Sequence, residues 1–316
     1  MDKAWVLIEL LPQQLINGLT IGSVYALIAL GYTMVYGVLQ LINFAHGDLF
    51  MLGAMIAVFV LAGMAVTEPL SLGLAIPVLV GLFLVCMVLV AALGVTIERV
   101  AYRPLRHAGR LSPLISALGV SVFLENATMN VVGPGPRFLP EFVPTTELQI
   151  FGVTIQDKQI LILVVATGLM VWLHYLVNHT TFGLAVRATA EDKDAASLMG
   201  IEIDRVIGMV FVLGPALGAA GGVLFAMQYG VVLWNAGFLA GIKAFTAAVL
   251  GGIGNIPGAM LGGLLLGLIE TFGAGYLPIL THDVIGPEYK DIFAFVILIL
   301  VLIFRPMGIL GERVAR

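Results

Sequence analysis

Long apolar runs, separated by short polar segments, recur along the whole chain. They fall at about 14–40, 49–66, 71–97, 112–132, 158–178, 206–229, 239–253, 257–276 and 291–304. Most are close to the roughly 20 residues that an α-helix needs to cross a bilayer, although the 239–253 run is short and the first is long enough to bend. The pattern predicts an all-α polytopic membrane protein, a single transmembrane domain over residues 1–316 with roughly 8–10 membrane helices, some broken or re-entrant.

The composition supports this class. Hydrophobic residues make up 60% of the chain and charged residues only 11%, with a mean hydropathy of +1.08, whereas a soluble domain carries about 25% charged residues. The net charge of −4 gives no reason to expect a nucleic-acid partner. The lipid bilayer is therefore the first partner that the sequence predicts.

The distribution of Lys and Arg predicts which loops face the cytoplasm. Positive charge gathers in 98–110, in 180–205 and in the tail after Phe304, and the positive-inside rule places these segments in the cytoplasm. The 133–157 and 277–290 loops are then external. The side of the N-terminus stays open: a simple first span puts it outside and residues 43–48 near the cytoplasmic face. A break within 31–48 would put it inside and move residues 43–48 to membrane depth.

The two longest loops differ in what they predict. The external loop 133–157 contains four prolines, which exclude a long helix, and its end, 148–156, could form a short hairpin. A docking surface and a mere connector are equally good interpretations of it. The cytoplasmic loop 180–205 is more organised, because Thr189 can cap a short helix that Gly200 ends.

That predicted cytoplasmic helix has charged and apolar sides. Glu191 and Asp192 fall in its first turn, which suits the helix dipole. The apolar positions are Ala195, Ala196, Leu198 and Met199. A helix of about three turns is not stable alone in water, so we expect it to pack on its own bundle or to insert into a groove of a soluble partner.

Polar residues interrupt the apolar pattern between Asn43 and Asp48. Asn43 could end one helix, Gly47 could permit the turn, and Asp48 could cap the next helix by accepting from backbone N–H groups. This leaves His46 without a firm role. A second interruption lies in the other half of the chain, and its residues are Gly251, Gly252, Gly254, Asn255 and Pro257.

Interrupted apolar segments in both halves suggest two related halves and point to a transport pathway. Irregular backbone at membrane depth is tolerated only where protein or a water-filled cavity covers it. We therefore expect both breaks to line the pathway, at Asn43, His46, Gly47 and Asp48 and at the five residues of the second break, and Pro257 to start a helix. The free helix ends would give a substrate's charged groups weak, transient partners.

Other features of the apolar runs have simpler interpretations. Glu125 and Glu270 fall near the outer boundary, where solvation at the interface is favoured over a role in the pathway. The pairs Gly258/Gly262 and Gly263/Gly267 have the spacing of close helix contacts. We expect them to pack helices within the chain rather than at a dimer seam with a second chain.

The sequence lacks the motifs of ATP hydrolysis and of membrane enzymes. It contains no G-x-x-x-x-G-K-[ST] and no H-E-x-x-H, and it shows no metal-ligand spacing and no convincing catalytic group. The chain is therefore expected to be a transport subunit without its own ATPase site, and its energy would come from a partner or from an ion gradient.

Several long motifs, in one order, resemble a known family. Bacterial ATP-binding cassette (ABC) importer permeases carry an EAA-type coupling loop, which this chain's RATAEDKDAASLMGI resembles. The matching segments of LivH-type permeases, which serve branched-chain amino acid import, are similar to LINFAHGDLFMLGAM, KAFTAAVLGGIGNIPGAMLGG, NGLTIGSVYALIALGYTMVYG and EYKDIFAFVILILVLIFRPMGILG. The similarity extends from about Gln13 to Gly311, and the 133–157 loop matches least.

This resemblance implies one multi-pass permease subunit of a heteromeric importer in a bacterial inner membrane. A second, LivM-type permease, two cytoplasmic ABC ATPases and an external amino-acid-binding protein would accompany it. ATP and Mg would be held by the ATPases and no cofactor by this chain. The helix over 189–200 would sit in a cleft of one ATPase, with coupling residues Thr189, Glu191, Asp192, Ala195, Ala196 and Gly200.

Three alternatives remain beside branched-chain amino acid import. Related permeases carry urea or short amides, and specificity usually rests with the binding protein. A gradient-driven secondary amino acid transporter would work without partners and would pair its acids at mid-membrane. An intramembrane enzyme is the least favoured, because no catalytic group is visible.

Overall fold

The computed structural model describes residues 3–66, 68–106, 108–109, 111–150 and 152–311. Its α-helices are α1 Lys3–Leu39, α2 His46–Gly63, α3 Leu72–Ile97, α4 Leu111–Val132, α5 Asp157–His179, α6 Thr181–Glu191, α7 Lys193–Leu198, α8 Ile203–Tyr229, α9 Ala236–Gly251, α10 Ile256–Thr281 and α11 Lys290–Phe304. The shorter elements are a π-helix η1 Glu98–Tyr102, 3₁₀-helices η2 Arg103–Leu105 and η3 Pro287–Tyr289, and strands β1 Arg137–Phe138, β2 Glu147–Ile150, β3 Val153–Gln156 and β4 Val231–Val232.

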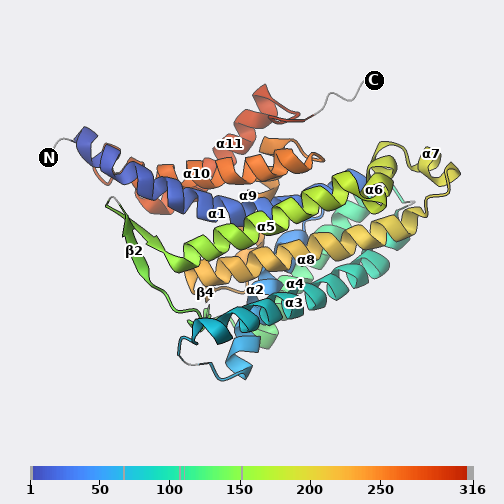
Figure 1. The fold of residues 1–316 in the computed structure, drawn as a ribbon. Coiled ribbons are helices and arrows are strands. Elements are labelled where there is room, and N and C mark those ends of the chain that lie inside the picture. The colour runs from blue at the N-terminus through green and yellow to red at the C-terminus, as the bar shows by residue number, and fades with distance from the viewer. Residues whose placement is uncertain (1–2, 67, 107, 110, 151, 312–316) are drawn as a thin grey trace.

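Within the described residues, seven helices are long and apolar enough to cross a membrane, and α9 is a shorter apolar helix. This confirms the predicted all-α polytopic class. The helices form one bundle, with α6 and α7 at one end and the β2–β3 hairpin at the opposite end (Figure 1). The hairpin confirms the prediction for residues 148–156, and Gly152 turns it with a φ of 80°.

The N-terminal part of α1 lies at the hairpin end of the bundle. The Gln13 side chain donates to the Thr154 carbonyl over 3.0 Å and accepts from the Thr154 N–H over 2.9 Å. Gln159 of α5 also donates to Asn17 over 2.9 Å. Because the positive-inside rule predicts that the hairpin end is external, the start of α1 is predicted to lie outside as well.

Helix α1 runs unbroken to Leu39 through the centre of the bundle, and α10 packs along it. Glycines make this contact possible, since Gly263 and Gly267 of α10 touch the backbone at Ala26 and Gly22 of α1. The other predicted pair, Gly258 and Gly262, packs against the end of α9 instead. Both glycine pairs therefore pack helices within the chain, as expected.

The α1–α10 contact predicts a specific stability effect. A Cβ added at Gly267 would lie 2.6 Å from the Gly18 carbonyl oxygen, so the helices must separate. We expect Gly267→Ala to destabilise the folded protein by about 1–3 kcal/mol, the usual cost of overpacking, and to lower its melting temperature in detergent.

A matched control comes from α5. A Cβ at Gly168 would meet no described atom within 4 Å, so Gly168→Ala should leave the melting temperature unchanged or raise it through helix propensity. Equal melting temperatures for the Gly267→Ala protein and the wild type would show that the two helices are not held at backbone contact.

Candidate functional site

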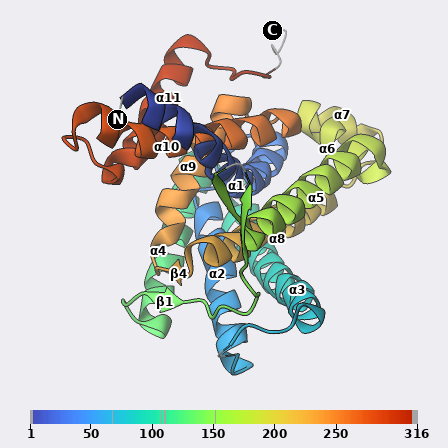
Figure 2. The ribbon, with the colours of Figure 1, turned by 60° about the vertical axis from the view of Figure 1, so that its left-hand side comes forward.

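Helices α2 and α9 both begin inside the bundle, and their first turns touch. A Cβ added at Gly47 would lie 2.7 Å from the Gly241 Cα, and one at Gly237 would lie 2.6 Å from Asp48 Oδ1. Glycine is therefore required on both sides of the contact. The two helices lie side by side near the middle of the molecule (Figure 2).

The depth of this junction follows from the helices beside His46. A Cβ at Gly218 would lie 3.4 Å from the His46 Cε1 atom, and the His46 ring also touches Gly31. Gly218 lies about 22 Å along α8 from Ile203, and Gly31 about 12 Å before the end of α1. The start of α2 thus lies within the bundle although α1 itself is unbroken, a combination that neither predicted alternative for the first segment contained.

The predicted helix-end roles of Asn43 and Asp48 are wrong. α1 ends at Leu39, where Gln40 adopts a left-handed φ of 58°, and α2 begins at His46 with Ala45 at its N-cap position. Asp48 is the third residue of α2 and caps nothing. A hydrogen bond holds Asn43 instead, because Tyr102 Oη donates to its Oδ1 over 2.6 Å.

Around the start of α2, several polar atoms are buried without a hydrogen-bond partner among the described residues. They are Thr33 Oγ1, Asn43 Nδ2, both ring nitrogens of His46, both carboxylate oxygens of Asp48 and Glu125 Oε1. Such atoms are rare in folded proteins, since each costs about 1–3 kcal/mol. The ring of His46 packs edge-on against Tyr32, with centroids 4.7 Å apart.

The second predicted break lies at the other end of α9. Asn255 Oδ1 accepts from the Gly258 N–H over 2.9 Å, with Pro257 in the first turn of α10, which confirms that this proline starts a helix. Gly252 and Gly254 have positive φ values of 112° and 94°. Gly237 and Gly251 are about 21 Å apart along α9, so the structure does not bring the two breaks together.

The C-terminal segment covers the second break. Leu310 N–H donates to the Gly251 carbonyl and Ile309 N–H to the Leu250 carbonyl, each over 2.9 Å. Asn255 Nδ2 donates to the Leu310 carbonyl over the same distance. The role of this break in the pathway remains a prediction, and its backbone is held by the tail rather than by α2.

The sequence-based prediction missed a buried charge cluster on α1, α9, α10 and α11. Lys243 Nζ lies 2.8 Å from Glu270 Oε1 and 2.5 Å from Asp291 Oδ1. Tyr25 Oη donates to Glu270 Oε2 over 2.9 Å, and Lys290 is 3.9 Å from Oε1. Glu270 is only 2% exposed, so its expected solvation at the interface is wrong. The sequence feature that could have indicated this cluster is Lys243, a single lysine within the apolar 239–253 run.

The cytoplasmic loop contains two helices where one was predicted. Asp192 caps α7 by accepting from the N–H groups of Asp194 and Ala195 over 2.8 and 2.9 Å. This local cap ends α6 at Glu191, so Thr189 is buried inside α6 and caps nothing. Gly200 adopts the predicted left-handed conformation, with a φ of 86°.

Residues after the cap point away from the bundle. Ala196 is buried and Ala195 exposed, while Leu198 and Met199 are 89% and 83% exposed at the end of α7. If this end of the bundle faces the cytoplasm, as the positive-inside rule predicts, apolar side chains this exposed indicate a binding surface. Partial desolvation and the charge of Arg106 lower the pKa of Lys193, which places α7 within electrostatic reach of the residue after η2.

Ion pairs and a hydrogen bond connect this loop region to the start of α2. Asp204, in the first turn of α8, pairs with Arg103 and with Arg106 Nη1, the latter over 2.6 Å. Arg106 also pairs with Glu98, which is 3% exposed in the π-helix η1. The last residue of η1 is Tyr102, the donor to Asn43.

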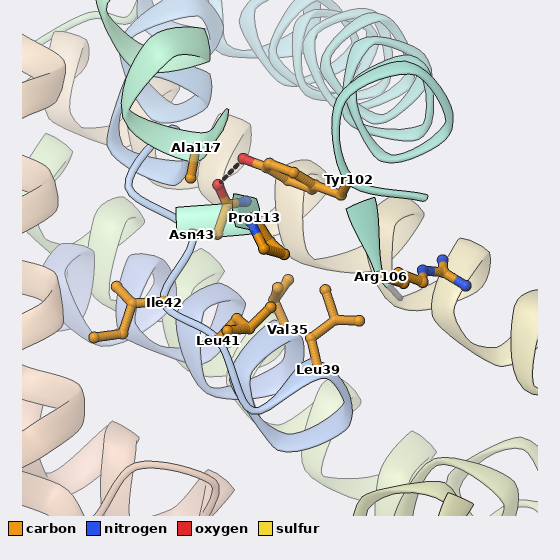
Figure 3. Close-up of a pocket in the computed structure, with 9 residues that line it drawn as sticks. All are labelled: Val35, Leu39, Leu41, Ile42, Asn43, Tyr102, Arg106, Pro113 and Ala117. Carbon is orange, nitrogen blue, oxygen red and sulfur yellow. Dashed lines mark hydrogen bonds between the residues drawn. The ribbon is translucent and has the colours of Figure 1, made fainter. Parts of the chain in front are cut away.

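Figure 3 shows the Tyr102–Asn43 hydrogen bond of this connection beside a small, mostly apolar cavity of about 20 Å³. The cavity lies between the end of α1, the 40–45 segment, η1 and the start of α4. Its lining residues are Val35, Leu39, Leu41, Ile42, Asn43, Tyr102, Arg106, Pro113 and Ala117. A π-helix next to such a cavity is frequent at functional sites.

Comparison with known proteins identifies the family. The model of the family described as "Branched-chain amino acid transport system / permease component" matches residues 14–302. The chain is 50% identical over 306 residues to the high-affinity branched-chain amino acid transport system permease protein BraD of Pseudomonas aeruginosa, with 95% of each chain covered. It is 44% identical to LivH of Salmonella typhimurium, again over 95% of each.

One more distant relative and one solved structure also align with this chain. A probable branched-chain amino acid transport permease protein LivH of Methanocaldococcus jannaschii is 29% identical over 92% of this chain and 89% of its own length. A solved structure, PsaBC from Streptococcus pneumoniae in complex with Fab, aligns over 94% of this chain and 92% of that chain, with 15% identity and a TM-score of 0.45. On the family match and the identities, this chain belongs to the family of permease components of branched-chain amino acid transport systems.

Proposed function

We propose that this chain is one permease subunit of an ATP-driven importer that moves branched-chain amino acids across a bacterial inner membrane by alternating access. Its partners would be a second permease, two cytoplasmic ATPases that bind ATP and Mg, and an external amino-acid-binding protein. The observation that carries the proposal is the exposed Leu198–Met199 pair on α7, in a chain that belongs to a transport-system family.

The α7 tip suits insertion into an ATPase. Its two side chains are almost fully exposed, and burying each would yield about 1.5–3 kcal/mol. α7 has only six residues and is fixed at both ends, by the Asp192 cap and by Gly200. A short, fixed helix can pass a displacement of the ATPase to α6 and α8 without bending.

The junction of α2 and α9 suits the pathway. Both helices present their N-terminal ends inside the bundle, where the free N–H groups carry partial positive charge. Such ends would hold a substrate's carboxylate weakly, which is enough when an external protein supplies the affinity. In this proposal Asn43, His46, Gly47 and Asp48 line the pathway at mid-depth, and Gly251 to Pro257 line its cytoplasmic end.

The π-helix η1 would couple the two regions. Asp204 begins α8 directly after the α7 loop, Arg103 and Arg106 pair with it, and Tyr102 of η1 holds Asn43 before α2. A movement of α7 and α8 would therefore pull on the segment that positions α2.

Removing the Tyr102 hydroxyl tests this coupling. We expect Tyr102→Phe to lower the amount of leucine transported per ATP hydrolysed by about tenfold, because Asn43 loses a buried hydrogen-bond partner worth about 1–3 kcal/mol. The measurement uses proteoliposomes that contain this chain, the second permease and both ATPases, with loaded binding protein. Tyr36→Phe is the control, since the Tyr36 hydroxyl makes no hydrogen bond to any described residue. An unchanged ratio in the Tyr102→Phe complex would exclude this coupling route.

A gradient-driven secondary transporter is the second candidate, and the Lys243–Glu270–Asp291 cluster favours it. Buried, paired charges in membrane helices often mark ion or proton pathways. The two functions differ in one assay: proteoliposomes holding this chain alone would take up leucine under a sodium or proton gradient only if it is a secondary transporter. Uptake of urea or short amides in the complete complex would instead revise the substrate.

A further inference from the structure

We infer that Asp48 of α2 and Glu125 of α4 together form a binding site for the ammonium group of the transported amino acid. The inference rests on the proposed import function and assigns one substrate group to one place in the pathway. The most unusual side chain of the site is that of Asp48. Asp48 is 0% exposed, and neither of its oxygens has a hydrogen-bond partner among the described residues.

Asp48 also has no compensating positive charge. None of the ion pairs of the described residues involves Asp48 or Glu125, and the charged and titratable side chains that face Asp48 are Glu125, Tyr32 and Tyr102. A carboxylate in a protein interior costs several kcal/mol unless it is paired. The structure therefore holds an acid at this depth whose natural partner is a mobile cation.

Glu125 completes the site from a different helix. Its side chain is half-buried, Oε1 is fully buried without a hydrogen-bond partner in the described part of the chain, and its helix α4 packs against α2, which carries Asp48. Ser121, one turn earlier on α4, also faces Asp48. Two carboxylates supply more acceptors than the three N–H groups of a primary ammonium need.

The start of α9 lies in contact with Asp48. Gly237, at the start of α9, lies so close to Asp48 that a Cβ there would be 2.6 Å from Oδ1. The N–H groups of the first turns of α2 and α9 lie beside the acids, and they would attract the substrate's carboxylate. The two acids would bind the ammonium group and the helix N-termini would bind the carboxylate. This arrangement suits a zwitterionic α-amino acid.

Helix α4 can give access to the site. It packs mainly against η1 and α2, with Ser116 Oγ donating to the Ala101 carbonyl of η1 over 2.9 Å. Since Arg106 pairs with both Glu98 of η1 and Asp204 of α8, a shift of η1 would move Glu125 relative to Asp48. The ammonium site would then be assembled and opened by the same element that couples the cytoplasmic loop.

Ligand-observed NMR tests the inference on the purified permease–ATPase complex without its binding protein. The probes are leucine, 3-methylbutylamine, which keeps the ammonium but lacks the carboxylate, and 4-methylpentanoate, which lacks the ammonium. We expect Asp48→Asn and Glu125→Gln to weaken leucine and 3-methylbutylamine binding by about tenfold or more, since a hydrogen bond to a charged group is worth about 1.5–3 kcal/mol. Binding of 4-methylpentanoate should not change.

Glu141→Gln is the matched control, because Glu141 is an exposed acid of the external loop without an ion pair among the described residues. Elution volume and the amount of ATPase that co-purifies verify assembly, and Glu125→Gln alone decides the question if Asp48→Asn does not assemble. Equal leucine binding in all variants, or no leucine binding by the wild type, would overturn the inference. Displacement of leucine from the wild type by sodium ions would also overturn the inference, because it would indicate an alkali-cation site.

The same preparation separates this inference from the proposed function. ATP-driven leucine uptake by the wild-type complex is measured in parallel with the NMR experiment. Absent uptake refutes the proposed function, whereas normal uptake with unaltered binding in the variants refutes only the ammonium site.

Discussion

Replacing Leu198 and Met199 with aspartate will release the partner ATPases from the permease. Both side chains are more than 80% exposed at the end of α7, and an ATPase that covers them loses about 3 kcal/mol or more when they become charged. That loss corresponds to an affinity reduction of more than about a hundredfold. The measurement is co-purification of tagged permease with the ATPases, followed by the uptake assay.

The control for this double substitution lies at the opposite end of the bundle. Val284 is 78% exposed in the loop between α10 and α11, so Val284→Asp also replaces an exposed apolar side chain with a charged one, but far from α7. It should leave the ATPases bound. Retention of the ATPases by the Leu198→Asp/Met199→Asp protein would show that they dock elsewhere.

Lys243→Met will be the most destabilising single substitution in the buried charge cluster. It removes the cation that lies 2.8 Å from Glu270 and 2.5 Å from Asp291, and it leaves Glu270 with Lys290 at 3.9 Å. Breaking a buried ion pair from one side costs about 3–5 kcal/mol. The expected result is a strongly lowered melting temperature in detergent and reduced yield.

A second substitution should restore much of the loss. In the Lys243→Met/Glu270→Gln protein no unpaired carboxylate remains on α10, so its melting temperature should rise above that of the single variant. Lys158→Met is the control, because Lys158 is half-buried and pairs with no described acid. A melting temperature of Lys243→Met equal to that of Lys158→Met would contradict a stabilising role for the cluster.

The sequence predicts the features of this protein that depend on neighbouring residues. The apolar run at 257–276 becomes α10, Pro257 begins it, and Gly200 ends the α7 segment in the left-handed conformation. Each follows from periodicity or from the conformational preference of one residue. The same is true of the hairpin, which is set by alternating residues and Gly152.

Features that depend on distant contacts could not be predicted. Asn43 and Asp48 have the residue types of helix ends, yet Asn43 is held by Tyr102, which lies 59 residues away. Lys243 and Glu270 are 27 residues apart and meet only when α9 folds back against α10. Thr189 and Asp192 both have side chains that can cap a helix. Asp192 is the actual cap, because it accepts hydrogen bonds from the N–H groups of Asp194 and Ala195.

The backbone contact between α1 and α10 has a consequence for biosynthesis. Ribosomes add about 5–20 residues per second, and 242 residues separate Leu39 from Thr281. Helix α1 therefore spends about 10–50 s in or beside the membrane before the helix that covers Gly18 and Gly22 has been made. During that time the glycine face of α1 needs a temporary neighbour, either the insertion machinery or a helix made before α10. The buried Thr20 and Ser23 lie near this face.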